Sequence, residues 1–191
     1  MIAEEEKHRG YNICISQDEM AENPRNYQMG TILSMDGANE VTNGILNDVR
    51  DKINYNMPVM KAIKSHYPDV VWVHKLYRYS HGSDTYALHR NFPDARWDLS
   101  WIGYYFVTRE DIHNWYSRKS MSDKLRERIY GDVAHMLEEY TNWCNGWIYG
   151  FMIKEIENVD LDGIFYGGYN TPQEALDEAI AQIDYTLDED S

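Results

Sequence analysis

The stretch VVWVHKLYRYS (Val70–Ser80) decides the fold, together with the HGSD of residues 81–84 and the TYALH of residues 85–89 that follow it. β-Branched and aromatic residues fill the first stretch, and these residue types favour extended strands. The HGSD tetrapeptide has turn chemistry, so the two flanking stretches are expected to pair as a hairpin. The segment LSWIGYYFV (residues 99–107) is apolar along nearly its whole length and is expected to be a central strand of the sheet.

Further strands are predicted on both sides of this hairpin. YNICIS (residues 11–16) alternates between apolar and polar residues, and YQMGTILSM (residues 27–35) follows a polar loop. Towards the C-terminus, residues 147–156 and 163–169 are two more candidate strands, and an acidic turn joins them. The first ten residues are polar and are expected to be a flexible N-terminus.

Start signals predict two helices between these groups of strands. Thr108 is followed three residues later by Asp111, which is the pattern of a capping box, and Ser122 is expected to cap a longer helix. Residues 47–55 and 59–66 are weaker helical candidates. The longer helix carries an apolar stripe at three- and four-residue steps, consisting of Leu125, Ile129, Val133, Met136, Leu137, Tyr140 and Cys144.

The strongest local signal lies near the C-terminus, where Thr171, Pro172 and Glu174 have the spacing of an N-cap, a first helical residue and a capping-box acid. The helix that follows is expected to be amphipathic. Its apolar side consists of Leu176, Ala179, Ile180, Ile183 and Leu187, and its outer side of Glu174, Asp177, Glu178, Asp184 and Asp188.

These elements predict an α+β fold, with a mainly antiparallel sheet and helices packed on one face. A chain of 191 residues has the length of a single domain. We expect that domain to cover residues 11–188, with residues 155–191 as a strongly acidic segment that ends in the amphipathic helix.

Charge is distributed unevenly along the chain. The sequence has 32 Asp and Glu residues against 18 Lys and Arg, a net charge of −14. Residues 155–191 contain 11 of these acids and no Lys or Arg. Direct binding to a nucleic-acid backbone or to an anionic membrane is therefore not expected, because both need Lys and Arg side chains. A metal ion or a basic patch of another protein could be attracted instead.

Three interpretations of this acidic segment stay open: a solvated face that only aids solubility, a face that binds a basic partner, and a divalent-cation site. The second interpretation names nine candidate partner-binding residues in two patches. The helix supplies Glu174, Asp177, Glu178, Asp184 and Asp188, and the preceding turn supplies Glu155, Glu157, Asp160 and Asp162.

Other chemistry finds little support in the sequence. His74, His81, Asp84 and His89 lie on or beside the predicted hairpin, but they lack metal-ligand spacing, so no metal is expected. The glycine-rich and nucleophile motifs of cofactor-binding and hydrolytic enzymes are missing, so neither a cofactor nor catalytic residues are expected. Cys14 and Cys144 are too few for a disulfide framework, and Cys144 is expected in the core.

Three stretches resemble a family of small acidic proteins carried by bacteriophages and mobile elements. They are ENPRNYQMGT (residues 22–31); LYRYSHG (76–82) with WDLSWIGYYFV (97–107); and EYTNWCNGWIYGF (139–151). The resemblance covers most of residues 18–169, but Asn26 and Tyr27 stand where the family pattern has Glu and Trp. It implies an accessory protein of phage type in a bacterial cytoplasm.

The resulting hypothesis is a non-enzymatic protein that binds and inhibits a nucleic-acid-handling host protein, in an anti-CRISPR or anti-restriction role, by imitating DNA. An alternative is an interaction or regulatory module with an aromatic binding surface, since Tyr and Trp are enriched at interfaces. A third hypothesis is a metal-dependent enzyme that uses His74, His81, Asp84 and His89. A homo-oligomer stays open under each of them.

Overall fold

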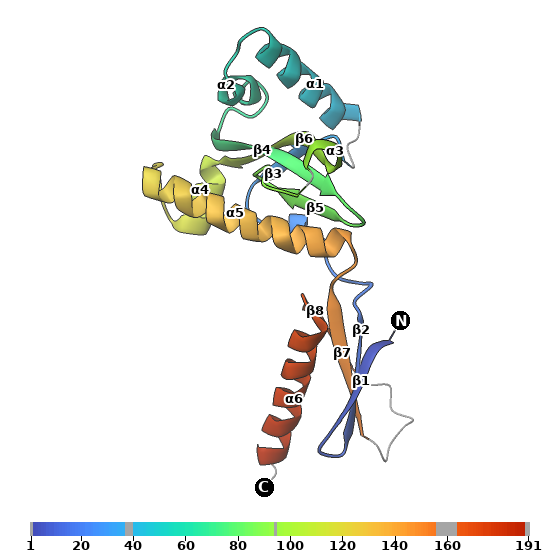
Figure 1. The fold of residues 1–191 in the computed structure, drawn as a ribbon. Coiled ribbons are helices and arrows are strands. Elements are labelled where there is room, and N and C mark those ends of the chain that lie inside the picture. The colour runs from blue at the N-terminus through green and yellow to red at the C-terminus, as the bar shows by residue number, and fades with distance from the viewer. Residues whose placement is uncertain (1, 37–39, 94, 156–163, 190–191) are drawn as a thin grey trace. The chain divides into compact units, whose positions relative to one another are not determined.

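The two ends of the chain belong to one folded unit, and the middle of the chain forms another. The computed structural model describes residues 2–36, 40–93, 95–155 and 164–189 (Figure 1). Unit 1 consists of Met1–Asn23 and Asn142–Ser191, and unit 2 consists of Pro24–Thr141. The two units are described one at a time.

Unit 2 is built on an antiparallel sheet whose two inner strands are the ones that the sequence marks most clearly. β4 (Val70–Ser80) pairs with β6 (Leu99–Thr108) over nearly its whole length. β5 (Asp84–Ala87) returns along the end of β4, which confirms the predicted hairpin. β3 (Thr31–Ser34) lies on the other side of β6, so the strand order is β3-β6-β4-β5.

Helices cover both faces of this sheet, where the sequence analysis expected one covered face. From Tyr104 onwards, successive β6 side chains enter opposite cores. Tyr104 and Phe106 pack with Leu46 and Ile63 of the helices on one face. These are α1 (Glu40–Asn54) and α2 (Val59–Lys64); the short α3 (Ala95–Asp98) precedes β6. An apolar strand with two buried faces needs a layer on each side.

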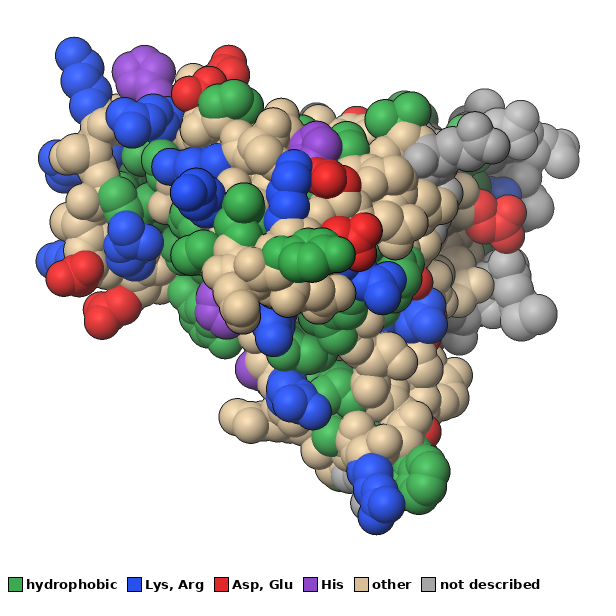
Figure 2. All heavy atoms as spheres, turned by 90° about the horizontal axis from the view of Figure 1, so that it is seen from above, with side chains coloured by type: hydrophobic (Ala, Val, Ile, Leu, Met, Phe, Trp, Pro, Cys, Tyr) green, Lys and Arg blue, Asp and Glu red, His purple; other side chains and the backbone are tan. Residues whose placement is uncertain are grey.

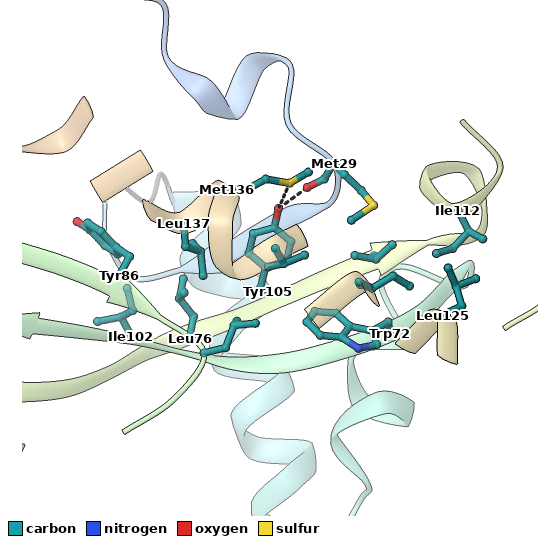
Figure 3. Packing of buried hydrophobic residues seen from close by; sticks show 14 residues of the cluster. Met29, Trp72, Leu76, Tyr86, Ile102, Tyr105, Ile112, Leu125, Met136 and Leu137 are labelled. Atoms are coloured by element: carbon teal, nitrogen blue, oxygen red, sulfur yellow. Dashed lines mark hydrogen bonds between the residues drawn. The ribbon is translucent and has the colours of Figure 1, made fainter. Parts of the chain in front are cut away.

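The second face is covered chiefly by α5 (Asp123–Cys144), with α4 (Arg109–Tyr116) beside it. The predicted stripe of α5 is buried from Leu125 to Leu137, and it packs against Trp72, Leu76 and Tyr105 (Figure 3). α4 begins as predicted, with Thr108 and Asp111 forming a capping box.

The hydroxyl group of Tyr105 lies in this core and is hydrogen-bonded there. Its hydroxyl donates to the carbonyl oxygen of Met29 (Figure 3). Arg25 donates to the same hydroxyl at 3.1 Å and lies over the Tyr105 ring. Residues 24–28 form a turn that begins with the short 3₁₀ helix η1 (Pro24–Asn26), because the backbone N–H of Gln28 donates to the carbonyl oxygen of Pro24. The predicted strand at residues 27–35 is therefore shortened to β3.

Unit 1 is a second antiparallel sheet with one helix against it. The strand order is β1-β2-β7-β8. Ile13, Ile15 and Phe151 of this sheet are buried against Leu176 and Ile183 of the helix, as the amphipathic pattern predicts. The elements are β1 (Ile2–His8), β2 (Tyr11–Gln17), β7 (Tyr149–Glu155), β8 (Phe165–Tyr169) and α6 (Pro172–Glu189).

The N-terminus is a strand rather than the flexible segment that was expected. β1 pairs with β2, and the register ends with His8 opposite Tyr11. The two residues between them, Arg9 and Gly10, have φ angles of 43° and 91°. Two consecutive left-handed residues make the tight turn that suits a two-residue hairpin.

The α+β class and the antiparallel pairing are thus confirmed. The strands divide between two sheets, whereas the sequence predicts a single sheet. The sequence contains the strands of both sheets, but strand periodicity does not indicate which strands pair over long distances.

Gly103 provides a test of the sheet in unit 2. A Cβ atom at this position would lie 2.0 Å from the carbonyl oxygen of Leu33 on β3. We expect Gly103→Ala to lower the free energy of unfolding by about 1–3 kcal/mol or more, because backbone atoms of the neighbouring strand must move. Gly131 on α5 is the matched control, since a Cβ there meets nothing within 4 Å. Gly131→Ala should raise that free energy by about 0.5–1 kcal/mol. Equal thermal stability of the two variants would contradict the β3–β6 pairing.

Candidate partner-binding surface

The entire net charge of the protein lies in unit 1. Unit 1 contains 17 of the 32 acidic residues and only 3 of the 18 basic residues, Lys7, Arg9 and Lys154, which gives it a net charge of −14. Unit 2 contains 15 residues of each sign and is neutral. The acidic C-terminal segment is therefore joined by a second group of acids from the N-terminal end of the chain: Glu4, Glu5, Glu6, Asp18, Glu19 and Glu22.

α6 presents its acids outward because its opposite side is buried. Ala175, Leu176, Ala179 and Ile183 pack into the core of unit 1. We call the acids on the other side, Glu174, Asp177, Glu178, Asp184 and Asp188, the acidic face. All are exposed except Asp184, which is partly buried.

Two members of the acidic face have basic partners from the far end of the chain. Arg9 lies 2.9 Å from Asp184 and 3.3 Å from Asp188, measured from its Nη1 atom to a carboxylate oxygen of each. His8 Nε2 lies 2.8 Å from the same oxygen of Asp184. These hydrogen bonds lower the pKa of Asp184, that from His8 most and that from Arg9 next. The sequence shows no base near these acids, because Arg9 is 175 positions away from Asp184 along the chain.

Glu174 has a structural role at the start of α6. Its Oε2 accepts from the backbone N–H of Asn170 at 3.0 Å, while its own N–H donates to Thr171 Oγ1 at 3.1 Å. A capping acid of this kind stabilises the first turn of the helix. Replacing Glu174 would therefore perturb the helix as well as the surface charge.

Asp177 and Glu178 keep their charge available at the surface. Asp177 accepts from the neutral amide of Gln173 at 2.7 Å, which leaves its charge in place. The pKa of the Tyr169 hydroxyl is raised, chiefly by burial and further by the negative charge of Glu178. These two residues are the members of the acidic face best suited to meet a cationic partner.

The second predicted patch falls largely outside the described residues. Glu157, Asp160 and Asp162 belong to the undescribed segment, and only the backbone of Glu155 is placed. Glu155 ends β7 opposite Tyr11, next to the Arg9–Gly10 turn.

β1 adds acids that the sequence analysis missed. Glu4 pairs with Ile15 and Glu6 with Ile13. Directly paired residues of antiparallel strands share a face, so Glu4 and Glu6 lie on the face of the sheet that α6 covers. Both side chains are exposed. If residues 2–8 are interpreted as a strand, successive side chains point to opposite faces, and Glu4 and Glu6 lie on the same face.

The structure does not bring the hairpin histidines together. His81 Nδ1 lies 2.9 Å from Asp98, His89 stacks on Phe92, and His74 stacks on Trp72. Burial lowers the pKa of His74. Within the described ranges, no three His, Cys, Asp or Glu side chains are grouped so that they could hold a metal ion.

The two cysteines differ in their surroundings. Cys14 is half-buried on β2, and burial raises its pKa, with the charge of Glu5 as a further cause. Cys144 is exposed, which corrects the expectation that it belongs to the core. The buried stripe of α5 ends at Thr141, where unit 2 also ends, so the last turn of the helix lies beyond that core.

Comparisons with protein-family models, with curated proteins and with solved structures find no match to this chain. Among the described residues, none of the helices combines the length and the apolar character needed to cross a bilayer.

The ion pairs of Asp184 predict a pH-dependent stability. Ionised Asp184 should stabilise unit 1 at pH values above about 4, the ordinary carboxylate pKa, and this contribution should disappear as the pH falls through the lowered pKa of the folded state. Asp184→Asn should therefore have a lower Tm than the wild type at neutral pH, and the difference should vanish in strong acid. Circular dichroism melts across this range measure the effect.

Asp177→Asn serves as the control, because Asp177 accepts its hydrogen bond from the neutral amide of Gln173. We expect its Tm to follow that of the wild type at every pH. A Tm deficit of Asp184→Asn that stays constant into strong acid would show that the ion pairs do not stabilise unit 1.

Proposed function

We propose that this protein is a non-enzymatic inhibitor that binds the basic surface of a nucleic-acid-handling protein in a bacterial cytoplasm, such as a CRISPR effector or a restriction enzyme. The observation that carries the proposal is the concentration of the whole net charge of −14 in unit 1. The resemblance to acidic phage proteins supports the choice of partner class.

A surface that imitates nucleic acid needs closely spaced anions held on a rigid support. Duplex DNA carries about one negative charge for each 1.7 Å of its axis. α6 has 18 residues and a length of roughly 27 Å at 1.5 Å per residue. Its capped start and its buried apolar side hold Asp177 and Glu178 in fixed positions.

Glu4 and Glu6 on β1 extend this surface beside the helix. Because β1 is paired with β2, their backbone is held by the sheet. A groove lined by Lys and Arg could then exchange its counterions for carboxylates from two elements of unit 1. Such an association is fast at low salt and weakens steeply as the ionic strength rises.

A variant in which five acids of unit 1 are replaced by neutral amides tests the proposal. It leaves Glu174, Asp184 and Asp188 unchanged, because they have structural partners. Displacement of a labelled DNA duplex from purified CRISPR effectors and restriction enzymes, followed by fluorescence anisotropy, measures inhibition. We expect the wild type to displace the duplex and the variant to need at least about tenfold more protein, roughly the effect of losing one well-placed charged contact. The substitutions are Asp177→Asn, Glu178→Gln, Glu157→Gln, Asp160→Asn and Asp162→Asn.

The matched control removes five exposed acids from neutral unit 2. It should inhibit as well as the wild type, although its net charge changes by the same amount. Equal loss in the two variants would indicate a non-specific charge effect, and displacement that is unaffected by either set would refute docking through the five replaced acids of unit 1. The control substitutions are Asp51→Asn, Asp69→Asn, Glu110→Gln, Glu127→Gln and Glu138→Gln.

A second candidate function is an interaction module that uses an apolar surface. Ile164, Phe165 and Tyr166 are consecutive and are 70%, 39% and 37% exposed on and beside the edge strand β8. An apolar interface there would depend little on salt between low and moderate ionic strength. Partner binding that is insensitive to salt and is lost in Phe165→Ser would favour this function over the acidic one.

A further inference from the structure

A pocket of about 540 Å³ lies beside the start of α5 in unit 2. Three of its seven lining side chains are cationic, and none is acidic. Figure 2 shows Lys and Arg side chains gathered at the left of the view, the side on which α5 begins in Figure 1. The lining residues are Tyr116, Arg118, Ser120, Ser122, Lys124, Leu125 and Arg128.

We propose that this pocket binds a small molecule that carries several phosphate groups, such as a nucleoside polyphosphate. Arg and Lys are the side chains that bind phosphate oxygens most strongly, and Ser hydroxyl groups can donate further hydrogen bonds to them. The volume falls within the range of about 300–1,000 Å³ that is usual for small-molecule sites.

The cations of this pocket are available to a ligand. Arg118 and Lys124 are exposed, and no described acid lies within 4.0 Å of their charged nitrogens. Arg128 contacts Asp132 through Nε at 3.6 Å, so its two terminal nitrogens stay available for phosphate oxygens. Elsewhere in the protein, Arg9, Lys52 and Arg78 are engaged with carboxylates.

Tyr116 positions Arg128 at the wall of the pocket. The guanidinium carbon of Arg128 lies 5.1 Å from the centre of the Tyr116 ring. The Tyr116 hydroxyl donates to Asp132 at 2.7 Å, so one carboxylate holds both side chains. Burial and this hydrogen bond raise the pKa of Tyr116, which keeps its hydroxyl neutral and adds no negative charge to the pocket.

The attraction comes from the side chains and not from the helix end. Ser122 Oγ already accepts from the backbone N–H of Leu125 at 3.2 Å, so this N–H group in the first turn of α5 has its hydrogen-bond partner within the chain. The Ser122 hydroxyl can still donate its own hydrogen to a ligand. Asp123 and Glu127 lie on the same helix but do not line the pocket.

A small ligand fits this site better than a nucleic-acid strand does. A strand follows a row of cations over several phosphates, whereas three cations line this pocket. A small polyphosphate needs only a few cations around one pocket.

Calorimetric titration of the full chain at low ionic strength with inorganic tripolyphosphate tests the proposal, with ATP and a short DNA duplex as parallel arms. We expect one saturable site for tripolyphosphate and for ATP, with each competing against the other. Arg118→Gln/Lys124→Gln should weaken both by at least about tenfold, since two charge-assisted contacts are lost. Both replaced side chains are exposed, so the Tm should not change.

Arg50→Gln/Lys61→Gln is the matched control, because it removes two exposed cations of unit 2 outside the pocket. It should change the affinity by less than about twofold, as expected for distant screened charges. Equal weakening by both double variants would refute a specific site. Failure of tripolyphosphate to saturate at millimolar concentration would refute it too. Tight binding of the duplex without binding of tripolyphosphate would overturn the proposal in favour of a nucleic-acid surface.

Discussion

The pairing of β2 with β7 is the constraint on which unit 1 depends. Seven residue pairs, from Tyr11 opposite Glu155 to Gln17 opposite Tyr149, join segments that are more than 130 positions apart. This ladder places the N-terminal hairpin and α6 on one sheet, and it buries Ile13, Ile15 and Phe151 under the helix. Without it, the acidic helix would have no apolar support, and Arg9 would not reach Asp184.

The same constraint explains which features of the protein the sequence predicts. Signals confined to a few neighbouring residues are reliable here: the hairpin after Val70–Ser80, the capping box of Thr108, and the cap of α6 at Thr171 all appear as predicted. Their physics is local, since a cap or a turn is satisfied within four residues. The division into two sheets depends on long-range pairing, which short-range patterns do not encode.

In the candidate site, too, the features set by neighbouring residues were predictable and those set by long-range pairing were not. Helical periodicity alone placed Asp177 and Glu178 on the outer side of α6. The partners of Asp184 and Asp188 could not be predicted, because a charge count along the chain treats Arg9 as remote. Glu4 and Glu6 were missed because polar residues at a chain end suggest flexibility. Their pairing with Ile15 and Ile13 of β2 nevertheless gives their backbone fixed positions.

Net charge is a property of the whole chain, whereas binding responds to the charges within about one Debye length. In this protein, the net charge of the whole chain differs from the local charge of unit 2. The net charge of −14 lies in unit 1, whereas unit 2 is neutral. A neutral unit with 15 charges of each sign can gather its cations locally, as Arg118, Lys124 and Arg128 do around their pocket. The total charge of the chain therefore describes the surface of unit 1 but not the local charge around this pocket in unit 2.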